Sequence, residues 1–100
     1  MRFLPNPHWL AHLRPLSGLD ESVSDYVLGH DDAEEFLERS TQMFQFLVPR
    51  YEAEGKSYLT IGIGCTGGHH RSVAIAETLA QMLRDRGPFE VDVHHRDLPA

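Results

Sequence analysis

The segment from Cys65 to Ser72 combines residue types that bind a small anion. It reads Cys-Thr-Gly-Gly-His-His-Arg-Ser, and it joins an alternating apolar segment to a segment with helical apolar spacing. Glycines let the backbone approach a ligand closely, unpaired amides at a helix start favour an anion, and arginine offers two parallel donors to phosphate. The pattern therefore predicts an anion-binding loop in which Arg71 holds phosphate and Ser72 caps the helix or donates its hydroxyl.

Two apolar segments with a helix between them predict a parallel βαβ unit around this loop. Residues 58–64 and 89–94 are expected strands, and residues 73–83 are expected to be helical. A further short strand is expected at residues 2–4, before two prolines. The expected fold class is α/β, as a small three-layer sandwich with a mostly parallel sheet.

Two other helices are expected before the loop. Asp20 is the expected N-cap of a helix that ends at Gly29, and Asp31 or Asp32 is the expected N-cap of a longer helix with one apolar face. Pro49 is expected to kink or end that longer helix, because proline removes a backbone hydrogen bond and clashes one turn back. Such helices cover the sheet in α/β proteins.

The expected sheet brings three segments to one edge. Ligands of open α/β sheets bind at the carboxyl ends of the strands, where the glycine loop and residues 94–97 are both expected. The turn at His8 follows the first expected strand, so it is expected in the same pocket. The sequence contains 7 histidines, but His69 and His70 are adjacent and no Cys-x-x-Cys spacing occurs, so no metal site is predicted.

The composition bounds the class of protein. One domain with one modest core suits 100 residues, and a net charge of −6 argues against a broad electrostatic contact with nucleic acid. The single cysteine excludes an internal disulfide. Together with the absence of an apolar run of about 20 residues, it indicates a cytoplasmic protein that has no membrane partner.

Four separated blocks of the sequence resemble, in order, the C-terminal domain of the RapZ/YvcJ family of bacterial nucleotide-binding proteins. The blocks are residues 2–9, 13–20, 58–73 and 95–98. The resemblance implies a phosphofructokinase-type subdomain, with residues 1–100 forming one such domain of a longer protein or an unusually short natural version. In that family ATP or GTP binds to an N-terminal P-loop domain. No cofactor is expected in this chain, because it has no Gly-x-x-x-x-Gly-Lys-Ser/Thr motif.

The resemblance also implies a function. It implies a metabolite-sensing regulatory adapter that binds a phosphosugar, with glucosamine 6-phosphate as the first candidate, and that has RNA as a partner. The basic surface for RNA is thin, because acidic residues surround the arginines of the last third of the chain. An exposed sheet edge favours a homo-oligomer. The expected ligand residues are His8, Cys65, Thr66, Gly67, Gly68, His70, Arg71 and Ser72, and the further expected pocket residues are Arg14, His95 and Arg96.

Two other functions remain open. The loop fits the pattern Cys-x-x-Gly-x-x-Arg-Ser/Thr and so resembles the phosphate loop of cysteine-dependent tyrosine phosphatases, in which Cys65 attacks phosphorus and Arg71 holds the phosphate oxygens. Gly64 replaces the histidine usual before that cysteine. The other alternative is an oligomerisation module with a vestigial anion site. We favour a binding domain over an enzyme, because a short pattern recurs by chance more easily than four ordered blocks.

Overall fold

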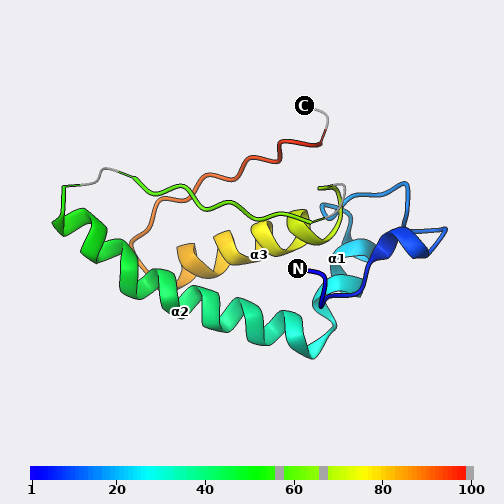
Figure 1. The fold of residues 1–100 in the computed structure, drawn as a ribbon, viewed down its shortest axis with the longest axis horizontal. Coiled ribbons are helices and arrows are strands. Elements are labelled where there is room, and N and C mark those ends of the chain that lie inside the picture. Colours follow the sequence, from blue (N-terminus) through cyan, green and yellow to red (C-terminus); the bar gives the residue numbers. More distant parts are fainter. Residues whose placement is uncertain (56–57, 66–67, 99–100) are drawn as a thin grey trace.

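The computed structural model describes residues 1–55, 58–65 and 68–98, and helices account for its regular structure. In chain order these are the 3-10 helix η1 (Pro7–Trp9) and the α-helices α1 (Glu21–Leu28), α2 (Asp31–Ala53) and α3 (Arg71–Arg86). The two long helices α2 and α3 pack against each other, and α1 contacts both (Figure 1). No helix within the described ranges is both long and apolar enough to cross a membrane.

The helix α1 begins and ends where its sequence predicts. The side chain of Asp20 accepts a hydrogen bond from the backbone N–H of Ser22 at 3.0 Å, which satisfies one of the unpaired amides of the first turn. Gly29 follows the last helical residue, and its backbone N–H donates to the carbonyl oxygen of Asp25. The predicted N-cap of α1 is therefore confirmed.

The long helix α2 differs from the prediction at both ends. Its N-cap is His30, whose Nδ1 accepts the backbone N–H of Asp32 at 3.2 Å, so neither aspartate is the cap. Asp31 and Asp32 instead occupy the first turn, where the helix dipole favours negative charge. Pro49 was expected to kink or end this helix, and it does not end it, because α2 continues through Pro49 to Ala53. The buried residues of α2 are Ala33, Leu37 and Thr41, all in its first half, whereas Pro49 is exposed.

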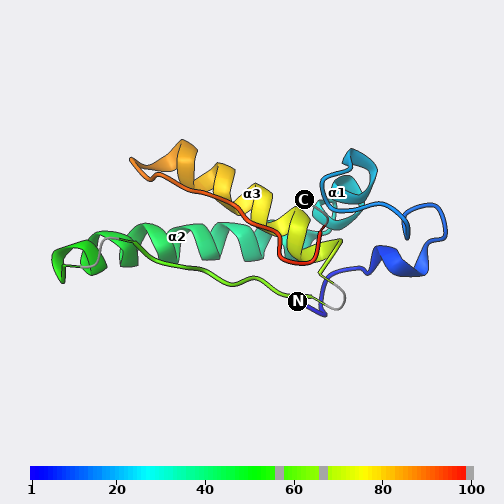
Figure 2. The same cartoon turned by 90° about the horizontal axis from the view of Figure 1, so that it is seen from above.

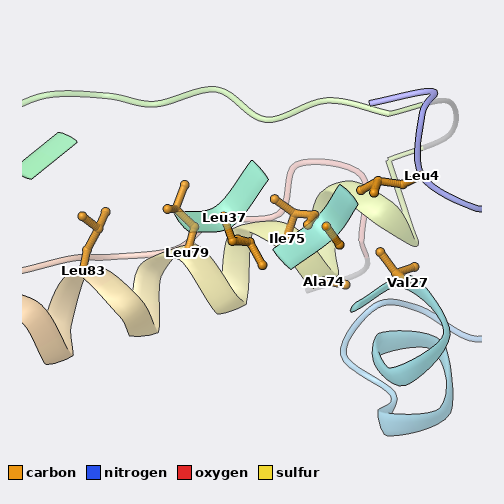
Figure 3. Packing of buried hydrophobic residues seen from close by; sticks show 8 residues of the cluster. Leu4, Val27, Leu37, Ala74, Ile75, Leu79 and Leu83 are labelled. Carbon is orange, nitrogen blue, oxygen red and sulfur yellow. The ribbon is translucent and has the colours of Figure 1, made fainter. Parts of the chain in front are cut away.

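The core lies between α2 and α3. On α3, Ile75, Leu79 and Leu83 recur at intervals of about one helical turn and belong to the same buried cluster as Leu37 of α2 (Figure 3). The buried core cluster consists of Leu4, Val27, Ala33, Leu37, Ala74, Ile75, Leu79 and Leu83. The members at the start of α3 pack against Leu4 and Val27, so the core holds this helix end against the first residues of the chain and against α1.

The predicted α/β sandwich with a parallel sheet is wrong, because no β-strand occurs in the described part of the chain. Residues 58–65 and 89–95 are extended, but they run as separate segments, one following α2 and the other following α3 (Figure 2). Residues 89–95 keep the predicted alternation, with every second side chain partly buried. Alternation alone predicts an extended backbone with two faces. A sheet also needs a neighbouring strand to pair with the backbone groups, and the periodicity carries no information about that neighbour.

The segment predicted as a strand at residues 2–4 is a turn. The backbone N–H of Leu4 donates to the carbonyl oxygen of Met1 at 3.2 Å, and the side chain of Leu4 is buried in the core. Burial of Leu4 fixes the preceding residues beside the start of α3 (Figure 2). The turn thus brings Arg2 to the loop that contains Cys65 and Arg71.

Candidate anion-binding site

A pocket lies at the start of α3, between the glycine loop and the first residues of the chain. Its volume is about 390 Å³, and its lining residues are Met1, Arg2, Gly64, Cys65 and Arg71. Pockets of this size accept small metabolites. The described lining residues carry two guanidinium groups and no carboxylate, so their chemistry suits an anion.

Arg71 is the central residue of this pocket, and its charge is almost completely buried. The residue is 4% exposed, and its Nη1 donates to the carbonyl oxygens of Met1 at 3.3 Å and of Leu4 at 3.4 Å. Its Nε is buried and has no hydrogen-bond partner among the described atoms. Buried charges are normally paired, and buried donors are normally hydrogen-bonded. The protein therefore holds a cation that the described residues leave without an anionic partner.

Close packing of Gly18 positions the first turn of α3. The backbone N–H of Gly18 donates to the carbonyl oxygen of His69 at 2.7 Å. A Cβ atom at this position would overlap the carbonyl oxygen of His70 and the backbone nitrogen of Ala74. The segment before α1 thus lies directly on the helix start that carries Arg71, and only glycine permits this approach.

Cys65 contacts the same helix start through its sulfur atom. Its Sγ accepts the backbone N–H of Ser72 at 3.2 Å, and the thiol donates to the Ser72 hydroxyl at 3.3 Å. Burial opposes ionisation of the thiol, but hydrogen bonds from Ser72 and from the backbone amides of Gly68 and His70 outweigh it, so the pKa of Cys65 is lowered. The Ser72 hydroxyl accepts in this contact, so its predicted role as a donor to a ligand stays a prediction. The predicted N-cap role of Ser72 is wrong, because the residue at the N-cap position is His70.

Gly68 joins the loop to the last described segment of the chain. Its φ is +67°, and a Cβ atom there would overlap the side chain of Asp97. The Nε2 of His69 donates to the carbonyl oxygen of Asp97 at 2.8 Å. Both contacts hold residues 95–98 against the glycine loop. The predicted neighbourhood of these two segments is therefore correct, although no sheet brings them together.

The predicted ligand residues His70 and His8 and the predicted pocket residue Arg14 are not among the lining residues of the pocket. His70 is buried, and its Nε2 donates to the carbonyl oxygen of Arg14 at 3.2 Å. Arg14 is exposed, and its Nε donates to the carbonyl oxygen of His8 at 2.6 Å. The exposed ring of His8 packs edge-on against Trp9. These contacts connect the turn after Pro7 to α3, so the three side chains contribute to local structure in the described chain.

The other predicted residues have structural partners or lie outside the described residues. The Nε2 of His95 is 2.8 Å from Oε1 of Glu77 on α3, which ties the last segment to the helix. Arg96 is exposed and forms an ion pair with Asp97 at 3.4 Å. Thr66 and Gly67 lie outside the described residues. Of the predicted ligand residues, the structure brings Cys65 and Arg71 together in the pocket lining, with Ser72 bonded to the thiol.

Arg2 is a lining residue that the sequence analysis missed. It is exposed, and neither a hydrogen bond nor an ion pair is seen for it within the described ranges. Its signal in the sequence was a single positive charge two residues before the buried Leu4, in the first block of the family resemblance. Because residues 2–4 were assigned to a strand, Arg2 was not considered as a pocket residue. No cluster of three potential metal-ligating side chains occurs in the described part of the chain.

Comparisons with known proteins confirm the family resemblance. The family model described as the RapZ C-terminal domain matches residues 1–99. A protein named nucleotide-binding protein from Corynebacterium glutamicum (strain R) is 53% identical over 98% of this chain and 32% of its own length. Proteins of the same name from Rubrobacter xylanophilus and Thermobifida fusca are each 57% identical, over 98% and 97% of this chain and 33% of their own lengths. The chain spans about a third of the length of these curated relatives. It belongs to the RapZ C-terminal domain family.

Proposed function

We propose that this chain is a regulatory domain that binds a phosphosugar, with glucosamine 6-phosphate as the first candidate, in the pocket at the start of α3. The observation that carries the proposal is the guanidinium group of Arg71. It is buried, it lines the pocket, and its Nε has no partner among the described atoms. A phosphate group supplies both the negative charge and the acceptor oxygens that a buried guanidinium requires.

The surroundings of Arg71 favour a dianion. Arg2 adds a second positive charge at the pocket, and the backbone amides at the start of α3 add the partial positive charge of a helix N-terminus. The volume of about 390 Å³ leaves room for a sugar beside the phosphate. The chain as a whole has a net charge of −6, so anion binding here requires this local arrangement.

RNA binding and oligomer formation stay predictions from the family resemblance. The arginines at the other end of α3 are engaged within the domain. Arg84 donates to the carbonyl oxygen of Val91 at 2.6 Å, and Arg86 forms two hydrogen bonds with Glu38. An electrophoretic shift that weakens as the salt concentration rises would support an RNA contact. Its absence at low salt would remove RNA from the role of this domain.

Thermal unfolding in the presence of ligands tests the proposed function. Glucosamine 6-phosphate at about 100 times its Kd is expected to stabilise the domain by about 2.7 kcal/mol and to raise Tm by on the order of 10 °C. Glucosamine, which lacks the phosphate, is expected to leave Tm unchanged. Inorganic phosphate should produce a smaller rise than the phosphosugar. Equal melting curves with a panel of phosphosugars, phosphate and buffer alone contradict the proposal.

A second candidate function is phosphate ester hydrolysis, and the hydrogen bonds to Cys65 favour it. A thiol that accepts a backbone N–H and has a lowered pKa is suited to nucleophilic attack on phosphorus. The described pocket lining contains no carboxylate or imidazole that would protonate a leaving group, which favours binding over catalysis. Steady hydrolysis of an aryl phosphate that disappears in Cys65→Ser would establish the enzyme. Failure of the wild-type chain to turn over would exclude it.

A further inference from the structure

The sulfur atom of Cys65 lies in a setting that activates a thiol. Cys65 lines the pocket, is partly exposed, and accepts a hydrogen bond from the second residue of a 16-residue helix. Backbone amides at a helix start stabilise a thiolate because its negative charge meets the positive end of the helix. The lowered pKa of Cys65 agrees with this geometry. A larger fraction of thiolate at neutral pH makes the sulfur a better nucleophile.

Arg71 supplies an independent observation in the same pocket. Its guanidinium is buried, with a donor atom that has no partner among the described atoms. A ligand anion and the Cys65 thiolate would therefore be attracted by the same positive charges. Two negative charges at one helix start repel each other. The thiolate form of Cys65 therefore disfavours anion binding, and a bound anion disfavours the thiolate.

We propose that Cys65 is an oxidation-sensitive thiol, and that its oxidation by a hydroperoxide and the binding of a phosphosugar exclude each other. The exclusion rests on the proposed function of the pocket, whereas the reactivity of the thiol rests on the geometry around Cys65. The pocket then combines two inputs in one site. The abundance of an anionic metabolite and the level of peroxide both determine its state.

The hydroperoxide is the oxidant in this reaction, and it accepts the two electrons that the sulfur loses. The thiolate Sγ attacks one peroxide oxygen, an S–O bond forms, and the O–O bond breaks. The second oxygen leaves as hydroxide or alkoxide and takes a proton from water. The product is the sulfenic acid of Cys65, with sulfur oxidised and the peroxide reduced. The chain contains no second cysteine, so reduction requires a thiol from another molecule, which first forms a mixed disulfide and releases water.

Oxidation changes both the charge and the space of the pocket. The thiolate becomes a neutral sulfenic acid, which removes its repulsion toward a bound anion, but the added oxygen atom reduces the free volume. A mixed disulfide adds a bulkier group, so we expect the loss of volume to outweigh the change in charge. Either product occupies volume beside Arg71 that the phosphosugar would use. In the other direction, a bound phosphate covers the sulfur and raises the pKa of the thiol by repulsion between like charges. The two effects act in the same direction, because the bound ligand slows oxidation of the thiol and the oxidised thiol leaves less space for the ligand.

The test measures sulfenic acid formation by intact mass after incubation with hydrogen peroxide and dimedone, which traps sulfenic acid as a stable adduct. We expect one adduct per chain, formed several-fold faster in the folded than in the denatured chain, and none in Cys65→Ser. Glucosamine 6-phosphate at about ten times its Kd should slow the reaction about tenfold, since about one chain in eleven is then free. Glucosamine should give no protection.

A second set of measurements tests the reverse effect and the role of Ser72. Peroxide treatment should raise the Kd for glucosamine 6-phosphate more than about tenfold, and a thiol reductant should restore it. The affinity of Cys65→Ser should be equal before and after peroxide. Ser72→Ala removes the hydroxyl contact to sulfur and should slow adduct formation, while Ser72→Thr retains a hydroxyl and should restore it.

The outcomes separate this inference from the proposed function. An adduct that forms no faster than in the denatured chain overturns the inference. Rapid oxidation without protection, at ligand concentrations that fully shift Tm, also overturns it and leaves the proposed function intact. Rapid oxidation of a chain whose Tm no phosphosugar shifts contradicts the proposed function and the exclusion, and leaves only the reactive thiol.

Discussion

The two ends of α3 each carry an arginine, and the fold treats the two side chains differently. At the C-terminal end, Arg86 is partly exposed and forms two hydrogen bonds with the carboxylate of Glu38 on α2, at 2.8 and 2.7 Å. At the N-terminal end, Arg71 is buried, contacts carbonyl oxygens at 3.3 and 3.4 Å, and has one donor without a partner among the described atoms. Arg86 is thus paired with a carboxylate, whereas Arg71 has no carboxylate partner among the described residues.

This difference suggests a structural role for the C-terminal end of α3 and a ligand-binding role for its N-terminal end. The ion pair between Arg86 and Glu38 joins α2 to α3, so a structural role accounts for Arg86. The buried charge of Arg71 does not, because removing a guanidinium from water costs free energy that two long hydrogen bonds to carbonyl groups do not offset. The proposed anion would account for the burial of Arg71, and substitutions at the two ends should therefore have different consequences.

Replacement of Arg71 by methionine should separate ligand binding from stability. Arg71→Met removes the charge but keeps the length of the side chain. We expect a loss of about 3 kcal/mol in phosphosugar binding, which is roughly a hundredfold in Kd. Without ligand, Tm should equal or exceed that of the wild type, because an unpaired buried charge is gone. Calorimetric titration and thermal melts measure both quantities. A lower Tm with unchanged affinity would show that Arg71 is a structural residue.

A methyl group at Gly18 should disturb the N-terminal end of α3. Gly18→Ala places a Cβ atom against the backbone of His70 and Ala74, and overpacking of this kind costs about 1–3 kcal/mol. Ligand affinity should fall with stability, because the helix start that carries Arg71 must move. Gly62→Ala is the matched control, since nothing lies within 4 Å of a Cβ there. Chemical denaturation measures the difference. Equal stabilities of the two variants would contradict the described packing.

Loss of the exposed cation at the pocket should weaken binding without affecting the fold. Arg2→Ala is expected to raise the Kd for glucosamine 6-phosphate about tenfold, which corresponds to one charge-assisted contact of about 1.5 kcal/mol. Arg96→Ala changes the net charge equally, but Arg96 lies outside the pocket lining and is paired with Asp97. Its Kd should stay close to that of the wild type. The same rise in Kd for both variants would show that only the overall charge of the chain matters.

The contact at the C-terminal end of α3 should have the smallest effect. The hydrogen bond from the Arg86 guanidinium holds the pKa of Glu38 below its usual value. Its contribution to stability is therefore present above the pKa that Glu38 has in the unfolded chain, and it is lost as pH falls through the lower pKa of the folded chain. Glu38→Gln should lower Tm slightly near pH 7 and reduce this acid dependence. Ligand affinity should not change, and a large change would contradict the separation of the two ends.

The helices were more predictable than the arrangement of the extended segments. The Asp20 cap and the apolar spacing on α3 are local signals, and the structure follows both. The predicted sheet was wrong because residues 58–64 and 89–94 fit a strand pattern, whereas strand pairing depends on which segments lie side by side. Pro49 is a second case, since α2 continues through this local helix-breaking signal.

The pocket was partly predictable for related reasons. Cys65, Arg71 and Ser72 are close in sequence, so one turn of chain is enough to bring them together. The position of His8 in the pocket was inferred from a sheet edge that does not exist in the described chain. Its side chain instead packs against Trp9. Arg2 reaches the pocket through burial of Leu4, a contact distant in sequence that no local pattern encodes.

The most direct measurement is the NMR signal of the Arg71 side-chain Nε–H group in the ¹⁵N-labelled chain, assigned by its loss in Arg71→Lys. Titration with glucosamine 6-phosphate should move this signal downfield, because a donor without a partner in the described structure gains a phosphate oxygen. Glucosamine should leave the signal in place. An Arg71 signal that stays unchanged at saturating phosphosugar would contradict the assignment of this buried charge to anion binding.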